Sequence, residues 1–435
     1  MARIAEIALA DHAAHRRLAE LTDRIGHRLS GSPELDRAIA WAVKSLQNDG
    51  QENVHTERVM VPRWVRGRES AQLIAPIQRP LEMLGLGGSI GTPKGGLTAE
   101  VLSVSTYEGL EKLGPEAKGK IILFDNPMED GTKYGQAVIF RASGAAHAAK
   151  QGAVGVLVRS VTPRSLRTPH TGSTHYEPKV KPIPAAAVSV EDATLITRLL
   201  TAGEKVRVRL EMGARALPDV PSANVIAELR GRERPEEIVV LGAHIDSWDV
   251  GQGAHDDGAG CVIVMDALRV LRALGTPPRR TVRVVLFTNE ENGLRGAKAY
   301  AKEHAAELRH HVAGIEADLG GFRPKGFWID GAPAAVDRMK GMAKLLGGLG
   351  ADGTEVSDYT GADVGVLQDA GIATLGLWMD VSTYFDYHHS KADTLDKVDP
   401  ADLQQAVAAT AAMAHLLADD PEPLPQRLPA KAGEP

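Results

Sequence analysis

Hydrophobic and polar residues recur with a helical spacing at the start of the chain and with a strand spacing soon after. The helical pattern runs to about Thr22, and a second helix is expected where Ser32 can cap it and Pro33 can occupy its first turn. This helix should end near residue 50, and the alternation of residues 54–61 then predicts a strand. The first part of the chain is therefore expected to be mainly helical.

Short strands dominate the next part of the chain, up to about Leu210. The predicted strands are 99–104, 120–124, 154–158, 185–190 and 206–210, with one alanine-rich helix at 142–151. The histidines of this part of the chain, His147, His170 and His175, are expected to lie at the surface and not to bind a metal. Because this part ends in a turn-rich stretch and carries no candidate metal ligand, we expect it to be an inserted domain, residues 71–215.

Strands and helices alternate after Ala223, as they do in a parallel sheet covered by helices. Residues 238–241 and 281–287 are short apolar runs typical of buried parallel strands. Residues 262–274 between them have the length and period of a helix. This pattern predicts the α/β class, with a mixed, mostly parallel sheet flanked by helices.

These segments predict one catalytic domain interrupted by a β-rich insert. Residues 1–70 and 216–420 are expected to form the catalytic domain, and the last helix is expected near 401–417. Residues 421–435 are rich in proline and poor in apolar residues, so we expect a disordered tail.

Composition and charge narrow the range of partners. Lys and Arg total 50 against 56 Asp and Glu, with no long basic block, so neither nucleic acid nor a membrane surface is an expected partner. No apolar run approaches the length of a bilayer span, and the first residues lack a signal-peptide pattern, so the compartment stays unknown. Cys261 has no second cysteine in the chain, which excludes an intrachain disulfide.

Five side chains that can bind a metal stand at the ends of apolar segments in the catalytic part. They are His244, Asp256, Glu291, Asp318 and His389. Histidine and carboxylate are zinc ligands, and an α/β sheet builds its active site at the carboxyl ends of its strands. Two Zn²⁺ ions carry four positive charges, which three carboxylates and one bridging hydroxide balance, and two imidazoles complete two four-coordinate shells. The set predicts a site for two zinc ions per chain.

Two of these fragments also have purely structural explanations. Asp246 is placed to orient the His244 imidazole through its other ring nitrogen, but the pair equally fits a buried histidine satisfied by an aspartate. Asp256 and Asp257 precede glycines and an apolar helix, where acids can act as caps. We expect Asp257 to cap the helix and Asp256 to bridge the metals.

The strongest single element is Glu290-Glu291, directly after a run that should be buried in the sheet. Neighbouring carboxylates repel each other unless something compensates their charge. A metal on Glu291 would provide that compensation and leave Glu290 beside the attacking water as general base. The chain contains no His-Glu-x-x-His helix motif and no Gly-x-Ser-x-Gly elbow, which disfavours thermolysin-like and serine hydrolases.

Four stretches of the sequence resemble the co-catalytic di-zinc aminopeptidase family, most closely its carboxypeptidase Q (plasma glutamate carboxypeptidase) branch. They are 243–249, 253–258, 289–291 and 388–394. Residues 28–33 and 84–93 resemble that branch as well, and 119–121, 152–156 and 183–188 resemble an inserted protease-associated domain. The resemblance implies a zinc exopeptidase fold over nearly the whole chain.

The resemblance also implies a role for each candidate residue. Asp256 would bridge two zinc ions, with His244 and Asp318 on one ion and Glu291 and His389 on the other. His389 is preferred to His388 because the family ligand stands four positions before the Asp of the Asp-Thr pair, Asp393. The metals would then activate a bridging hydroxide, with Glu290 as the general base.

For the substrate, the resemblance implies small peptides with free termini. Tyr387 or His388 would face the reacting carbonyl. Asp363 or Asp358 would meet the free amino terminus, or else structure its own loop. Relatives imply a possible homodimer and a secreted or periplasmic location.

Two other functions share this architecture. A glutaminyl-cyclase-like acyltransferase has most of the ligand motif, but the cyclases that the chain resembles lack the inserted domain. A noncatalytic, receptor-like binding protein would have lost ligands, whereas here all five ligands and the base are present.

Overall fold

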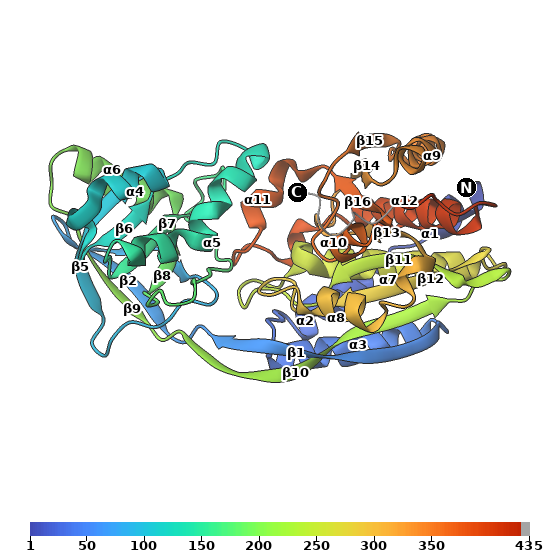
Figure 1. The fold of residues 1–435 in the computed structure, drawn as a ribbon, viewed down its shortest axis with the longest axis horizontal. Coiled ribbons are helices and arrows are strands. Elements are labelled where there is room, and N and C mark those ends of the chain that lie inside the picture. The colour runs from blue at the N-terminus through green and yellow to red at the C-terminus, as the bar shows by residue number, and fades with distance from the viewer. Residues whose placement is uncertain (428–435) are drawn as a thin grey trace. The chain divides into compact units, whose positions relative to one another are not determined.

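The computed structural model describes residues 1–427, which form two compact units. Unit 1 contains residues 1–61, 220–381 and 393 onward, and unit 2 contains residues 62–219 together with 382–392 (Figure 1). The insert was expected at residues 71–215. Residues 382–392 were expected within the catalytic domain, but their contacts place them in unit 2.

Unit 1 is built on an eight-stranded sheet with the order β1-β10-β12-β11-β13-β16-β14-β15. The strands are β1 (Glu52–Val65), β10 (Arg215–Leu229), β11 (Arg234–His244), β12 (Arg280–Phe287), β13 (His311–Glu316), β14 (Pro324–Asp330), β15 (Gly353–Val356) and β16 (Ala373–Met379). β11 is parallel to both β12 and β13, and β13 is parallel to β16, whereas β10 and β14 join antiparallel. The mixed, mostly parallel sheet is as predicted.

Helices cover both faces of this sheet. The helices of unit 1 are α1 (Ala2–Ala8), α2 (Ala13–Arg24), α3 (Pro33–Asn48), α7 (Gly260–Ala273), α8 (Arg295–Glu303), α9 (Pro333–Ala343), α10 (Gly365–Asp369) and α12 (Pro400–Asp419). Along β11, Val239 and Leu241 join the cluster that contains α7 and α12, while Ile238 and Val240 join the cluster of α8 and α10. Because successive strand residues point to opposite faces, the uninterrupted apolar run of β11 buries both faces of the sheet.

Unit 2 has its own eight-stranded sheet, with the order β3-β2-β9-β5-β6-β7-β8-β4. The strands are β2 (Glu69–Ala75), β3 (Arg79–Leu81), β4 (Met83–Gly85), β5 (Leu97–Val104), β6 (Ile121–Phe124), β7 (Gly155–Arg159), β8 (Ala185–Val188) and β9 (Arg207–Met212), and the helices are α4 (Tyr107–Leu113), α5 (Tyr134–Lys150), α6 (Val190–Thr201) and α11 (Tyr384–Tyr387). α6 packs on one apolar cluster of the sheet and α5 on another.

Three details differ from the predictions. The first helical segment is two helices, α1 and α2, and α5 begins eight residues before the predicted start at residue 142. No side-chain cap marks the start of α5, so the sequence carries no signal for it. The tail expected to be disordered is packed at its beginning, where Leu424 is buried and Arg427 pairs with Asp330. Residues 428–435 of that tail lie outside the described residues.

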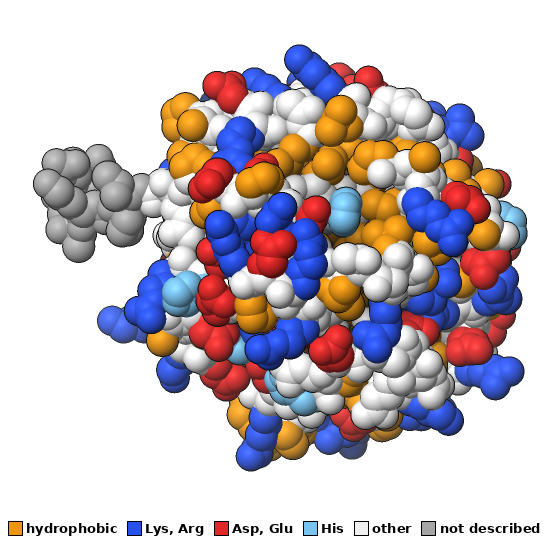
Figure 2. All heavy atoms as spheres, turned by 90° about the vertical axis from the view of Figure 1, so that its right-hand side faces the viewer, with side chains coloured by type: hydrophobic (Ala, Val, Ile, Leu, Met, Phe, Trp, Pro, Cys, Tyr) orange, Lys and Arg blue, Asp and Glu red, His pale blue; other side chains and the backbone are white. Residues whose placement is uncertain are grey.

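One face of the molecule carries charges of both signs. Figure 2 shows acidic and basic side chains interspersed across one face, with apolar side chains between them. Within residues 1–427, no helix combines the length and the apolar character needed to cross a bilayer.

Candidate active site

The register of the central strands brings three loops of unit 1 to the same edge of the sheet. His244 is the last residue of β11 and pairs with Phe287, the last residue of β12, while Gly242 pairs with Glu316 at the end of β13. The segments that follow β12 and β13 therefore start beside His244. This edge is where α/β proteins bind their ligands.

His244, Asp256 and Asp318 converge on one point at this edge. The His244 Nε2 atom lies 3.2 Å from an Asp256 oxygen and 3.5 Å from an Asp318 oxygen. Ligand atoms of all three residues lie within 4.8 Å of one another, and His244 and Asp256 are buried. One imidazole and two carboxylates in this arrangement suit a zinc ion.

The backbone carbonyl of Asp246, and not its carboxylate, orients the His244 ring. This corrects the role expected for the Asp246 side chain. The Nδ1 atom of His244 lies 3.0 Å from the Asp246 carbonyl oxygen but 3.8 Å from its carboxylate. Nδ1 therefore donates to the carbonyl, and Nε2 is left with the lone pair that a metal requires.

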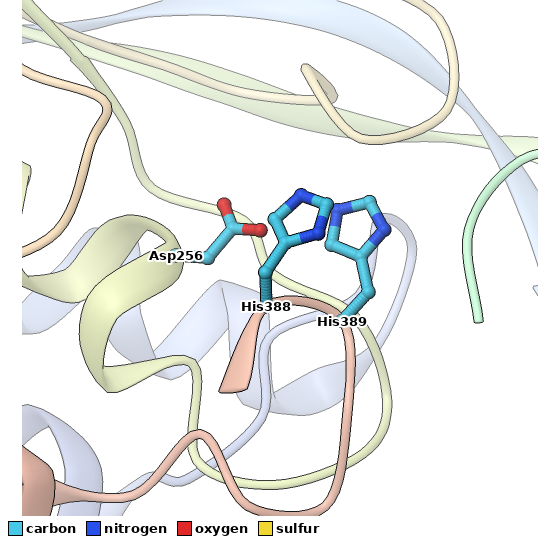
Figure 3. A group of neighbouring side chains, drawn as sticks. All are labelled: Asp256, His388 and His389. Atoms are coloured by element: carbon cyan, nitrogen blue, oxygen red, sulfur yellow. The ribbon is translucent and has the colours of Figure 1, made fainter. Parts of the chain in front are cut away.

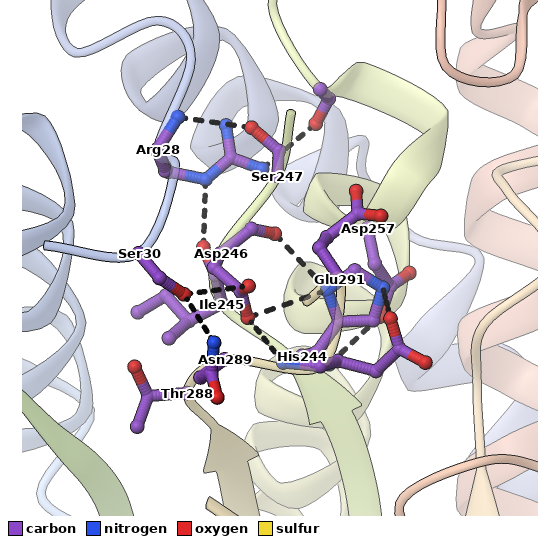
Figure 4. Close-up of polar contacts among 12 residues, drawn as sticks. Arg28, Ser30, His244, Ile245, Asp246, Ser247, Asp257, Thr288, Asn289 and Glu291 are labelled. Carbon is purple, nitrogen blue, oxygen red and sulfur yellow. Dashed lines mark hydrogen bonds and ion pairs between the residues drawn. The ribbon is translucent and has the colours of Figure 1, made fainter. Parts of the chain in front are cut away.

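The Asp246 carboxylate instead holds the loop after β12 (Figure 4). It accepts hydrogen bonds from the Glu290 backbone N–H at 3.0 Å and from the Ser30 hydroxyl at 3.2 Å. The Asn289 side chain in turn donates to the Ser30 hydroxyl at 3.0 Å. This network positions the backbone that carries Glu290 and Glu291.

Asp257 supports the histidine and the following helix, as expected for a residue that does not bind metal. One carboxylate oxygen accepts from the His244 N–H and the other from the Gly260 N–H, both at 3.0 Å. A side chain at position 260 would lie 1.9 Å from the Ala317 carbonyl oxygen, so this approach requires glycine.

Asp256 is held by a residue far away in the sequence. The Asp393 carboxylate accepts hydrogen bonds from the backbone N–H groups of His255, at 2.7 Å, and of Asp256, at 3.2 Å. Asp393 is 3% exposed, so these bonds are shielded from water. The Asp-Thr pair noted in the sequence thus supports the bridging candidate through its aspartate.

The adjacent glutamates occupy different environments. Glu291 accepts a hydrogen bond from the Trp248 N–H at 3.2 Å and is buried. The Glu290 carboxylate lies 4.0 Å from His244 Nε2 and its side chain is 20% exposed, so water can reach it. Glu290 therefore stands beside the converging ligands, where a general base belongs.

The charges at this edge perturb one another strongly. Burial by itself lowers the pKa of His244, but the Asp318 and Asp256 carboxylates outweigh it and raise that pKa well above its usual value. Burial, together with the charges of Asp318 and Glu291, raises the pKa of Glu290 well above the usual value for a carboxyl group. A divalent cation among these carboxylates would compensate the excess negative charge.

Asp363 is a second unusual carboxylate. It is fully buried, and neither of its side-chain oxygens has a hydrogen-bond partner within residues 1–427. Burial and the nearby Glu316 charge raise its pKa well above the usual value. Asp358, the other candidate in this segment, is exposed, so Asp363 is the better candidate to meet a cationic group.

His388 and His389 lie in the segment that belongs to unit 2. Their imidazoles stack, with ring centroids 3.6 Å apart; Figure 3 shows the two rings next to each other. The carbonyl of Tyr387 accepts hydrogen bonds from Ser390, which fixes the turn. The assignments of His389 to a metal and of His388 and Tyr387 to the substrate stay predictions.

Two buried residues have contacts that the sequence analysis did not predict. Arg28 is fully buried and donates to backbone carbonyls of the loop between His244 and Asp256. His170, expected at the surface, is 2% exposed, and burial lowers its pKa to about 3. The sequence analysis noted residues 28–33 only for their resemblance to a known family, and nothing in the local sequence indicated that His170 is buried.

Known proteins resemble this chain over almost its entire length. The family model described as peptidase family M28 matches residues 224–414, and the PA domain model matches residues 92–196. Carboxypeptidase Q of Xenopus laevis is 43% identical over 96% of this chain and 88% of its own length. A peptidase M28 precursor from Shewanella amazonensis, solved by crystallography, is 39% identical, covers 98% of each chain and has a TM-score of 0.94. A zinc aminopeptidase from Bacillus subtilis, 21% identical with a TM-score of 0.68 over 92% of this chain and 93% of its own, shares the fold.

Proposed function

This chain belongs to peptidase family M28 and is a metallo-exopeptidase, and we propose that it hydrolyses small peptides with free termini by means of two zinc ions. The observation that carries the proposal is the convergence of His244, Asp256 and Asp318 at the edge of the sheet, with Glu290 beside them. The donor set of one oriented imidazole and two carboxylates fits zinc.

The ligand sets follow the family pattern residue by residue. His244 and Asp318 would hold one zinc ion, Glu291 and His389 the other, and Asp256 would bridge the two. The Trp248 N–H on one Glu291 oxygen and the Asp393 carboxylate on the Asp256 backbone support this assignment, because ligand carboxylates are usually held by such outer contacts.

Catalysis at this site requires Glu290 to accept a proton from the attacking water and then to release it to the departing amine. Zinc, when bound, lowers the pKa of the attacking water and polarises the peptide carbonyl. Glu290 takes the proton of that water on its carboxylate and then delivers it to the departing amine. Its location beside His244, and the hydrogen bond from its backbone N–H to Asp246, keep the carboxylate in place for both transfers.

Substrate recognition is assigned to three further residues. Asp363 would accept the free ammonium group of the peptide, because a buried carboxylate without a partner gains most from a cation. His388 and Tyr387 would face the peptide carbonyl. A secreted or periplasmic location and a homodimer are proposed from the resemblance to the carboxypeptidase Q branch.

Product analysis on a peptide panel tests this function. The zinc-loaded protein is incubated with free dipeptides, N-acetylated dipeptides and dipeptide amides, and the released amino acids are separated. We expect release from the free dipeptides and little or none from the N-acetylated ones. If folded, zinc-bound protein released no amino acid from any peptide of the panel, the exopeptidase proposal would be refuted.

A further inference from the structure

A buried arginine in the inserted unit has no acidic partner among residues 1–427. Arg141 lies on α5, is 7% exposed, and forms no ion pair with any residue of the described chain. Its Nη2 donates to the Tyr134 hydroxyl at 3.0 Å, and its guanidinium packs so closely on Gly172 that a side chain there would lie 2.3 Å from the Cζ atom. Because burying an unpaired cation is costly, its location calls for a compensating role.

Arg141 shares one acceptor with the predicted metal ligand His389. The Thr171 carbonyl oxygen lies 3.3 Å from Arg141 Nη1 and 3.3 Å from His389 Nδ1, and Arg141 Nη1 lies 3.2 Å from His389 Nδ1 itself. A metal on Nε2 requires the proton on Nδ1, and Nδ1 and Arg141 Nη1 then both donate to the Thr171 carbonyl rather than to each other. Arg141 therefore positions the ring both through the Thr171 carbonyl and by direct contact with the imidazole.

The backbone of His389 is held by the same segment. His389 has a φ of +58°, in the left-handed region that side chains rarely adopt. The Thr171 N–H donates to the His389 carbonyl at 2.9 Å, and His170 Nδ1 lies 2.6 Å from the His388 carbonyl. Such a conformation persists only where its surroundings maintain it, and here residues 170 and 171 do so.

We propose that Arg141 is a positioning residue of the metal site, through which the inserted unit orients His389 for zinc. The inference rests on the proposed function, since it requires His389 to be a ligand. Losing a partner of a ligand histidine typically weakens metal affinity about 10–100-fold. The effect should fall on one zinc ion of the two, because His244 and Asp318 do not depend on Thr171.

Zinc affinity, measured without any substrate, tests the proposal. Wild type, Arg141→Met, Arg141→Lys and the control Arg159→Met are titrated with zinc in competition with a chromophoric chelator. Arg159 is a partly buried arginine of unit 2, where it bonds Asp125 at 2.8 Å and Thr194 at 3.0 Å. We expect Arg141→Met to weaken one site about 10–100-fold, Arg141→Lys to weaken it less, and Arg159→Met to bind as wild type does.

The outcomes separate this inference from the function on which it rests. Two zinc ions bound with wild-type affinity in Arg141→Met would overturn the inference and leave the function standing. Fewer than two zinc ions in the wild type would overturn the proposed function itself. Thermal unfolding of the apo proteins checks folding, and if Arg141→Met does not fold, wild-type affinity of both sites in Arg141→Lys overturns the inference.

Discussion

Replacing Arg28 by methionine should unfold the protein more easily and loosen the metal site at the same time. Arg28 donates four hydrogen bonds to backbone carbonyls, at 2.9 Å to Ile245, 2.9 Å to Gly26, 2.8 Å to Gln252 and 2.9 Å to Gly253. Three of these carbonyls, those of Ile245, Gln252 and Gly253, belong to the loop that runs from His244 to Asp256. Methionine keeps part of the apolar packing but removes every donor.

The size of the effect follows from which carbonyls water can reach. The bonds to Ile245 and Gly253 are buried, whereas those to Gly26 and Gln252 are only partly buried. Leaving a buried acceptor unsatisfied costs about 1–3 kcal/mol, so the two buried carbonyls give a loss of about 2–6 kcal/mol in the free energy of unfolding. A domain is typically stable by only about 5–15 kcal/mol, so the change is large.

Urea unfolding of the apo protein and zinc titration of the folded protein measure the two effects. Arg280→Met is the matched control, because Arg280 is also fully buried but stands at the start of β12, at the opposite end of the strand from the site. We expect both variants to be destabilised and only Arg28→Met to bind zinc more weakly. A loss below about 1 kcal/mol, or unchanged zinc affinity in Arg28→Met, would refute the reasoning.

Three further predictions concern single residues. His244→Gln should lower the zinc content of the purified protein from two ions to one, measured by elemental analysis; a content of two would remove His244 from the ligand set. Asp363→Asn should lower kcat/KM for free dipeptides about 10–100-fold, since a hydrogen bond to a charged group contributes about 1.5–3 kcal/mol. It should leave the melting temperature at or above that of wild type, because the carboxylate it removes is buried without a partner; a lower melting temperature would contradict this. His304 bonds Glu57 and Glu307, each at 2.8 Å, and the hydrogen bond with Glu57 raises its pKa. The stabilisation is complete below the unfolded value near 6.5 and is lost as pH rises through the raised pKa, so His304→Gln should cost more stability in urea at pH 6 than at pH 9.

Most of the central sheet could be predicted from the sequence because the apolar runs of its strands can be recognised without knowing their tertiary contacts. β11 and β12 bury both faces, and their ends therefore mark where His244 and the two glutamates emerge. The capping role of Asp257 was also predictable, since an acid before a glycine and an apolar helix has few other uses.

What the sequence did not reveal depends on contacts between distant residues. Arg28 bonds carbonyls 217 to 225 positions away, and no local pattern reports such partners. The choice between the carbonyl and the carboxylate of Asp246 as partner of His244 is set by the Ser30 and Glu290 contacts, which draw the carboxylate away. The same holds for residues 382–392, whose packing in unit 2 follows from partners such as Thr171 rather than from their place in the chain.

Hydrolysis of a free dipeptide by zinc-loaded Glu290→Gln tests the central claim most directly, with zinc content determined on the same sample and Glu228→Gln as control. Glu228 is a partly buried glutamate of unit 1 that pairs with Arg283 at 2.7 Å, so its variant loses an ion pair without touching the site. The account predicts that Glu290→Gln keeps both zinc ions and loses at least about 10²-fold in kcat, because it can no longer move the proton. Near wild-type kcat in Glu290→Gln with both zinc ions bound would contradict the assignment of Glu290 as the base.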